Sequence, residues 1–406
     1  MADNRLLLAA AQEDLEQVKS LVAAGECIDV QDENGRTPLF LAVQKNNLPL
    51  AKLLLDAGAN PNVRDNTILT PWLCAGANGF HEILKLMLSY GPDIKSSNRF
   101  GGTVLLPSSE KGYLPTVQVA IRAGVPVNHQ NKFAWSGLQE AVILGNGGFL
   151  YSDIIRTNIS AGADPYLKDY EYKTAMDWAQ SRSEENVVAL LTGTAPQPNY
   201  LPTREAYEAG AYEKGLELLR GDDPEAAYLR GYGLTLMGRY EEALRVYRNA
   251  AEAPEGLEFL FYSANVLRTM KRADEALAEY DKAVAAKPDY FFYRYHQSNY
   301  YRELGMHEDS VKAMDILLSY EPRRYDYMFH KSNSLRSLGR HEEALETMEK
   351  AIPIVPENPL FRYNKAQSLM LLKRYDEARS VLEEVVAMSA EPDYVADLER
   401  VKTLSR

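Results

Sequence analysis

Short blocks of apolar residues recur along the chain, and a glycine or a proline closes many of them. In the first half, Leu53–Leu55 and Leu84–Leu88 are each followed within three residues by a glycine, at Gly58 and Gly91. In the second half, an eight-residue phrase that usually ends in Ala-Leu recurs at 237–244, 270–277, 304–311, 338–345 and 372–379. Apolar residues three or four positions apart lie on one side of a helix. The pattern therefore predicts short helical units repeated at a fixed interval.

The interval in the second half is nearly constant. A small residue marks the same place in every copy, at Ala243, Ala276, Ser310, Ala344 and Ala378, so the steps are 33, 34, 34 and 34 residues. A period of 34 with Gly, aromatic, Ala and Pro landmarks resembles the tetratricopeptide repeat, whose units are pairs of antiparallel helices stacked into a superhelix. The resemblance implies about five units after a partial leading unit, and the stretch from Tyr394 to Leu404 is typical of an amphipathic capping helix.

The first half carries a different repeated phrase. Its unit-ending glycines Gly25, Gly58, Gly91 and Gly124 are each 33 residues apart, and two units open with Thr37-Pro38 and Thr70-Pro71. Threonine can accept hydrogen bonds from the unpaired N–H groups at a helix start, proline suits the first helical position, and glycine suits a left-handed exit. These features resemble ankyrin repeats, which implies about six units joined by short β-hairpin loops.

Two units of this first half depart from the pattern. In the fourth, Pro107 stands where the inner helix should continue, so we expect that helix to be shortened or kinked. In the fifth, Gly124 to Gly162 is 38 residues, and the extra residues surround Gly145-Asn146-Gly147-Gly148. A loop insertion explains this glycine-rich run better than a phosphate-binding loop does, because neither a lysine nor a strand pattern accompanies it.

The predicted fold is all-α, an ankyrin-repeat stack followed by a tetratricopeptide superhelix. We expect an ankyrin domain over residues 1–192, a proline-rich linker over 193–202 and a tetratricopeptide domain over 203–406. The linker contains Pro196, Pro198 and Pro202, which hold a chain extended.

Charge and composition exclude several classes of function. The net charge is −12, with 16 basic and 21 acidic residues before Pro196 and 29 and 36 from there on, so neither half has a basic excess for a nucleic-acid backbone. No stretch approaches the roughly eighteen apolar residues that span a bilayer. Acidic residues follow Leu6–Ala11 closely, which argues against a signal peptide. We expect a cytoplasmic protein whose Cys27 and Cys74 are small buried side chains.

No arrangement typical of an enzyme is present. HExxH, GxSxG, Walker-type and GxGxxG motifs are all missing from the sequence. His296 and His330 lie one repeat apart and should share a face, but a zinc site normally needs a third and a fourth ligand. We therefore expect no catalysis, no metal and no cofactor.

The residues that packing does not require indicate a binding surface in the second half. On the first helix of each unit, residues three or four apart should face the concave groove of a tetratricopeptide superhelix. The predicted groove residues are Tyr262, Asn265, Arg268, His296, Asn299, Arg302, His330, Asn333, Arg336 and Asn364. An Asn amide offers a donor and an acceptor to the backbone of an extended peptide, and Arg can bind carboxylates. The alternative is that these Asn side chains bond to neighbouring helices.

A second candidate surface lies on the hairpins of the first half. The later hairpins carry Phe100, Phe133, Trp135, Tyr170 and Tyr172, whereas the earlier ones are polar. Aromatic residues exposed on loops often mark an interface, although these could equally fold back onto the irregular fourth and fifth units.

These observations predict a non-catalytic scaffold or adaptor that binds a protein or an extended peptide in the tetratricopeptide groove, with the ankyrin domain as a second surface. The alternative is a cytoplasmic inhibitor, such as an immunity protein that binds a toxin, because the net charge of −12 suits a basic partner. The expected partner is another protein or peptide rather than nucleic acid, a membrane or a small-molecule substrate. The oligomeric state stays open.

Overall fold

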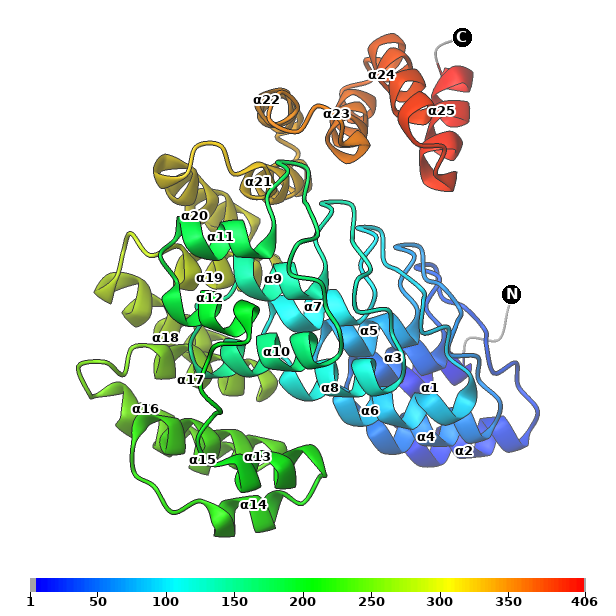
Figure 1. Cartoon of the computed structure of the whole chain (residues 1–406). Coiled ribbons are helices and arrows are strands. Elements are labelled where there is room, and N and C mark those ends of the chain that lie inside the picture. The colour runs from blue at the N-terminus through cyan, green and yellow to red at the C-terminus, as the bar shows by residue number, and fades with distance from the viewer. Residues whose placement is uncertain (1–4, 405–406) are drawn as a thin grey trace. The chain divides into compact units, whose positions relative to one another are not determined.

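Helices form every regular element of the computed structural model, which describes residues 5–404. The chain divides into two compact units, residues 1–195 and 196–406. In each unit, short helices follow one another in pairs (Figure 1). The all-helical repeat class predicted from the sequence is thus confirmed. Within residues 5–404, no helix combines the length and the apolar character that crossing a bilayer requires.

The first unit contains six helix pairs within the described residues, and the longer loops between pairs project from one side of the stack (Figure 1). The short 3₁₀ turn η1 (Leu88–Tyr90) extends the third pair. In chain order the pairs are α1 (Arg5–Ala11) with α2 (Leu15–Ala23), α3 (Pro38–Gln44) with α4 (Leu48–Asp56), α5 (Pro71–Ala77) with α6 (His81–Met87), α7 (Leu105–Glu110) with α8 (Leu114–Arg122), α9 (Gly137–Ile143) with α10 (Phe149–Ser160), and α11 (Ala175–Ser181) with α12 (Glu185–Thr192).

The inner helices begin where the capping residues predict. The Thr37 hydroxyl accepts a hydrogen bond from the N–H of Phe40 at 3.2 Å, and Thr70 accepts one from Leu73 at 3.1 Å. Ser136 with Gln139 forms a complete capping box, in which each side chain bonds to the other residue's backbone N–H. Each such cap satisfies an N–H group that has no partner inside the helix, which fixes the register of the repeat.

The predicted β-hairpins are not confirmed, because the described residues contain no strand. Each long loop instead turns around one Asp or Asn side chain, whose oxygen accepts the backbone N–H groups two and four residues later. Asp32, for example, accepts from Asn34 at 2.9 Å and from Arg36 at 2.8 Å. The equivalent residues are Asp65, Asn98, Asn131 and Asp169. These side-chain acceptors form an Asx turn, so few backbone pairs remain to build a strand ladder.

The residue at the tip of every loop has a left-handed backbone. Gly35 and Gly101 occupy this position in two loops, with φ of 75° and 77°. The other three loops place Ile68, Ala134 and Tyr172 there, with φ of 61°, 57° and 62°. A left-handed conformation is costly for residues with a Cβ and most of all for a β-branched one, so Ile68 is a strained position.

The irregular fourth and fifth units fit the stack with local changes. The helix α7 is six residues long and begins two residues after Thr103, whereas α3 and α5 have seven residues and begin directly after their threonine. Pro107 is its third residue, where the N–H has no partner in the helix anyway, so the helix is shortened and tolerates the proline. The insertion lengthens α10 to twelve residues, and the Gly147 carbonyl accepts hydrogen bonds from Ser152 and Asn186. The glycine-rich run is therefore a packed loop.

The second unit contains longer helices. Two short ones, α13 and α14, precede five complete pairs, and α25 follows them. Helix α13 begins at Leu201, inside the stretch predicted as linker. The elements are α13 (Leu201–Glu208), α14 (Tyr212–Leu218), α15 (Pro224–Leu236), α16 (Tyr240–Ala251), α17 (Glu258–Thr269), α18 (Ala273–Ala286), α19 (Phe291–Glu303), α20 (His307–Tyr320), α21 (Tyr325–Ser337), α22 (His341–Ala351), α23 (Pro359–Leu371), α24 (Tyr375–Met388) and α25 (Pro392–Leu404).

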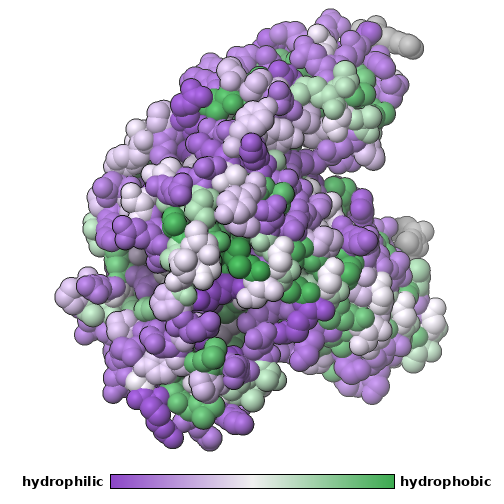
Figure 2. Space-filling model, viewed as in Figure 1, coloured by the Kyte–Doolittle hydropathy of each residue, from purple (hydrophilic) through white to green (hydrophobic). Residues whose placement is uncertain are grey.

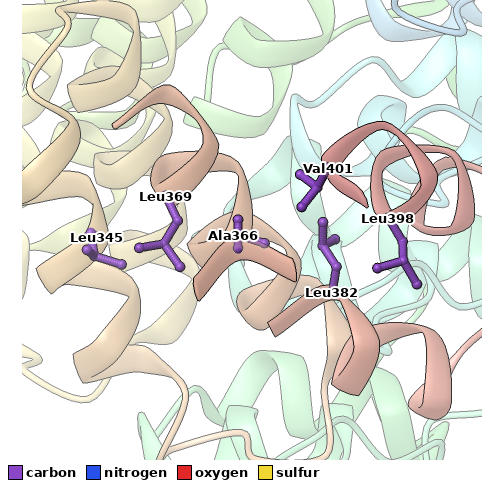
Figure 3. Close-up of a cluster of buried hydrophobic side chains, with 7 residues drawn as sticks. Leu345, Ala366, Leu369, Leu382, Leu398 and Val401 are labelled. Atoms are coloured by element: carbon purple, nitrogen blue, oxygen red, sulfur yellow. The ribbon is translucent and has the colours of Figure 1, made fainter. Parts of the chain in front are cut away.

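The last helix closes the second unit as a lone first helix of a further repeat would. Leu398 and Val401 of α25 are buried in a hydrophobic cluster with Leu369 and Leu382 from α23 and α24 (Figure 3). The Tyr363 hydroxyl donates a 2.8 Å hydrogen bond to Asp397. A helix with one apolar side covers the end of a repeat array in this way.

Candidate functional site

The predicted groove residues lie on four consecutive first helices, α17, α19, α21 and α23. We call Asn265, Asn299 and Asn333, together with the arginine three residues after each, the ladder face. Its members are half-buried except Asn299, which is 5% exposed. In the next unit Gln367 and Met370 occupy these places, so the Asn–Arg pair is confined to three units.

Each asparagine of the ladder face is bonded to its own arginine. Arg268 Nη1 donates to Asn265 Oδ1 at 3.3 Å, Arg302 Nη2 donates to Asn299 Oδ1 at 2.5 Å, and Arg336 Nη2 donates to Asn333 Oδ1. Residues three apart on a helix are neighbours on its surface, which explains the pairing. The Oδ1 acceptors are therefore occupied within the same helix rather than by a neighbouring one.

The same arginines also reach the next unit along the chain. Arg268 Nη2 donates to Glu303 Oε2 at 2.7 Å, and Arg302 Nη1 donates to His330 Nδ1 at 2.7 Å. Arg336 Nη1 donates to the backbone carbonyl of Asn364 at 3.1 Å. Each guanidinium thus ties its own asparagine to the following repeat, and we expect this to fix the orientation of the Asn amide.

The amide nitrogens of the ladder face are less constrained. Within residues 5–404, the Nδ2 groups of Asn265 and Asn333 donate no hydrogen bond, and both side chains are half-buried. Because Oδ1 accepts from arginine, the orientation of each of these amides is fixed, and its Nδ2 is the group left to donate a hydrogen bond to a ligand. Asn364 differs, because it is 3% exposed and its Nδ2 bonds to the Leu360 carbonyl at 3.0 Å.

The two histidines and Tyr262 pack within the unit. His296 is 1% exposed, and its ring centroid lies 5.0 Å from that of Phe261 and 4.6 Å from that of Phe292. Burial and the guanidiniums of Arg302 and Arg324 hold the pKa of His330 well below its ordinary value of 6.5. His330 is therefore neutral near pH 7, and its Nδ1 can accept the hydrogen bond that Arg302 donates.

The sequence did not point to a buried ion pair beside the ladder face. Arg324, which precedes α21, makes two parallel hydrogen bonds to Asp326, with Nε–Oδ1 at 2.8 Å and Nη2–Oδ2 at 2.7 Å. The two side chains are 5% and 1% exposed, and the guanidinium lies 4.0 Å from the ring centroid of Tyr327. Tyr290 and Asn358 occupy the equivalent places in the neighbouring units, so periodicity could not have identified Arg324.

The predicted aromatic residues of the first unit do not form one surface. Phe133 and Trp135 are 6% and 3% exposed, and their ring centroids lie 5.3 Å apart in a stacked arrangement. Burial favours the packing alternative for these two. Phe100 and Tyr170 are half-buried, whereas Tyr172 is 64% exposed. Sequence reasoning passed over Tyr166, which is 62% exposed in the same loop as Tyr172.

The described residues hold no arrangement that could bind a metal ion. Across residues 5–404, no three His, Cys, Asp or Glu side chains converge to form a metal site. Cys74 is buried and Cys27 is exposed, and neither is in a disulfide, so the expectation that both are buried is wrong for Cys27.

Three known families match parts of the chain. The family described as ankyrin repeats (3 copies) matches residues 6–98. The family described as tetratricopeptide repeat matches residues 228–291, and that described as anaphase-promoting complex, cyclosome, subunit 3 matches residues 303–385.

Similar proteins cover the first half. The ankyrin repeat protein YahD of Escherichia coli (strain K12) is 36% identical over 186 residues, which are 46% of this chain and 92% of that protein. A solved ankyrin repeat domain from Acinetobacter baumannii AYE is 41% identical, with a TM-score of 0.46, and the match covers 47% of this chain and 97% of that one. A chain in the structure of a predatory endopeptidase from Bdellovibrio bacteriovorus in complex with an immunity protein is 25% identical, with a TM-score of 0.42 and coverage of 48% and 99%.

The fold and the ladder face define a tandem of two helical repeat arrays. The chain belongs to the ankyrin-repeat proteins, and tetratricopeptide-type repeats make up its second half. Repeats of both families are typically interaction modules, which implies a protein partner.

Proposed function

We propose that this protein is a non-catalytic adaptor whose tetratricopeptide array holds an extended peptide along the ladder face, with the ankyrin stack as a second binding surface. One observation carries the proposal. The Nδ2 donors of Asn265 and Asn333 have no acceptor within the described residues, and the arginine bonded to each Oδ1 fixes the amide.

The geometry supports recognition of a peptide backbone. Amide N–H donors placed two repeats apart, at Asn265 and Asn333, suit the carbonyl groups of an extended chain, whatever its side chains. The guanidiniums are already bonded to Glu303, His330 and the Asn364 carbonyl, so they are better suited to positioning the amides than to binding ligand carboxylates. Figure 2 shows one face of the molecule, on which hydrophilic residues predominate and apolar residues are interspersed.

The test separates the donor role of asparagine from its structural role. Peptides that bind the full chain are first selected from a random linear library. Affinity is then measured for Asn265→Asp/Asn333→Asp, in which a carboxylate keeps the acceptor for Arg268 and Arg336 but removes the donor. We expect the affinity to fall at least tenfold while the thermal stability is kept or raised.

Two outcomes would contradict the proposal. Unchanged affinity in the Asp variant would return both asparagines to a purely structural role. A library that yields no binding peptide would rule out recognition of extended chains. The variant Asn249→Asp, on the second helix α16, serves as the matched control, and its affinity should stay unchanged.

A second candidate is an inhibitor that occludes a folded basic protein such as a toxin. The net charge of −12 favours it, because complementary charge accelerates encounter. In this case binding weakens with salt, requires the folded partner and fails for every linear peptide. The library selection therefore discriminates between the two functions.

A further inference from the structure

The loops between the helix pairs of the first unit differ in charge along the stack. The first loop, residues 24–37, contains four carboxylates and one cation. The next four loops, residues 57–70, 91–104, 123–136 and 161–174, contain six cations and five carboxylates. These four loops are thus close to neutral in a chain whose net charge is −12.

The carboxylates of these four loops are engaged in building the loops. Asp65 and Asp169 accept the backbone N–H groups of their Asx turns, and Asp93 and Asp164 accept the N–H groups of Lys95 and Tyr166. Glu171 forms an ion pair with Lys173 at 3.5 Å. Because backbone N–H dipoles offset these negative charges, their influence on an approaching ligand is reduced.

Three cations of the same loops are available. Arg64, Lys95 and Lys168 are exposed, and within residues 5–404 their side chains make no hydrogen bond or ion pair. In the second unit, by contrast, arginine after arginine is paired with a carboxylate, as Arg239, Arg272, Arg340 and Arg374 are. Arg99 and Lys132 add further charge at the tips of the third and fourth loops.

Exposed aromatic rings accompany these cations. Tyr166 and Tyr172 are 62% and 64% exposed. Hydrogen bonds tie each of these loops to the next. Asp93 N–H donates to Asn62 Oδ1 at 2.7 Å, which joins the loop of Arg64 to that of Lys95. Lys132 N–H donates to the Phe100 carbonyl at 2.8 Å, and Gln130 Nε2 donates to the Lys168 carbonyl at 3.0 Å. Rings on a rigid row provide contact area at a low entropic cost.

We propose that the tip surface, defined by Arg64, Lys95, Lys168, Tyr166 and Tyr172, binds an acidic segment of a protein partner. The inference rests on the proposed role as an interaction protein. It specifies that the partner of the ankyrin stack, the second binding surface, is acidic. Charge complementarity selects this occupant, since cations without partners meet the carboxylates of the ligand and the tyrosines cover its apolar groups. A nucleic-acid backbone fits less well, because the loop carboxylates interrupt the row of cations.

The experiment measures binding of a fluorescent Glu–Tyr copolymer to the full chain by anisotropy at low salt. The tip variant is Arg64→Glu/Lys95→Glu/Lys168→Glu. The control variant Lys19→Glu/Lys45→Glu/Lys85→Glu carries the same change of net charge on exposed positions within a helix or directly after one. Circular dichroism melting checks that both variants fold. We expect the Kd to rise at least tenfold in the tip variant and less than twofold in the control.

The outcomes separate this inference from the proposed function. Equal losses in both triple variants, or no binding by the unaltered chain, would overturn the inference. A single-stranded DNA oligonucleotide that binds more tightly than the copolymer, and is lost in the tip variant, would also overturn it by assigning the surface to nucleic acid. The Asn265→Asp/Asn333→Asp variant should bind the copolymer as the unaltered chain does. A failure of the ladder-face proposal would show in that variant and in the peptide assay, whereas a failure of this inference would show in the tip variant and in the copolymer assay.

Discussion

Replacing Gly231 in α15 by alanine is expected to destabilise the first complete tetratricopeptide unit, although alanine is the better helix former. In an isolated helix the change would favour folding by about 1 kcal/mol. In this protein a Cβ built on Gly231 would lie 2.2 Å from Cε1 and 2.4 Å from Cζ of Tyr247. Non-bonded carbon atoms are normally about 3.5–4.0 Å apart, so the ring would have to move by roughly 1.3 Å.

The Tyr247 ring has little room for this movement. It is 3% exposed, its hydroxyl donates to the Tyr228 carbonyl at 3.4 Å, and its centroid lies 5.4 Å from that of Tyr262. Overpacking a buried site typically costs about 1–3 kcal/mol, and losing the hydroxyl's hydrogen bond adds about 1 kcal/mol. Once the helix propensity is subtracted, we expect a net loss of about 1–3 kcal/mol of local stability.

Hydrogen exchange of the full chain provides the assay, because it reports the stability of α15 and α16 without assuming one cooperative transition. A double-mutant cycle with Tyr247→Ala isolates the clash. Where the ring is absent, Gly231→Ala should increase protection of α15 through helix propensity alone. Greater protection of α15 by Gly231→Ala in the unaltered background would refute the reasoning.

Three further predictions concern single residues. Asp326→Asn leaves the buried Arg324 without its main counter-charge, so the stability of α21 measured by hydrogen exchange should fall by about 3–5 kcal/mol. The control Asp309→Asn removes an exposed ion pair and should change that stability by less than about 0.5 kcal/mol. Ile68→Gly should stabilise the ankyrin stack by about 1 kcal/mol, as measured by chemical denaturation, since glycine adopts the φ of 61° at this position without strain. A loss of stability would mean that the packing of the Ile68 side chain outweighs the strain. Burial raises the pKa of Glu184 from 4.5 to about 7, so its contribution to stability is present below pH 4.5 and is lost as the pH rises through 7. Melting temperatures of Glu184→Gln measured between pH 5 and 8 should therefore fall less with rising pH than those of the unaltered chain.

The periodic features of the fold could be predicted from the sequence because the same helix caps and helix contacts recur in each repeat. Thr37 and Thr70 cap helices through contacts three residues away, and the 34-residue interval repeats the same packing in each pair. The predicted β-hairpins are not confirmed, because the prediction did not consider the Asx turns at Asp32 and its equivalents. The burial of Phe133 and Trp135 depends on tertiary contacts in an irregular unit, which periodicity cannot describe.

The candidate site was predictable in position but not in chemistry. Spacing placed Asn265, Asn299 and Asn333 on equivalent helices, yet it could not show which atoms of each side chain are occupied. The occupied atom bears on the proposed function, because Oδ1 of Asn265 and of Asn333 already accepts from arginine while the amide N–H groups stay available as donors.

The bonding of these arginines to the following unit links recognition to the shape of the array. Arg268 joins Asn265 to Glu303, so a ligand that pulls on the Asn265 amide also loads the contact between α17 and α19. Repeat arrays gain stability mainly through interfaces between neighbours. A peptide spanning Asn265 and Asn333 should therefore stiffen the contacts between units as it binds, and its affinity should depend on residues such as Glu303 that need not touch it.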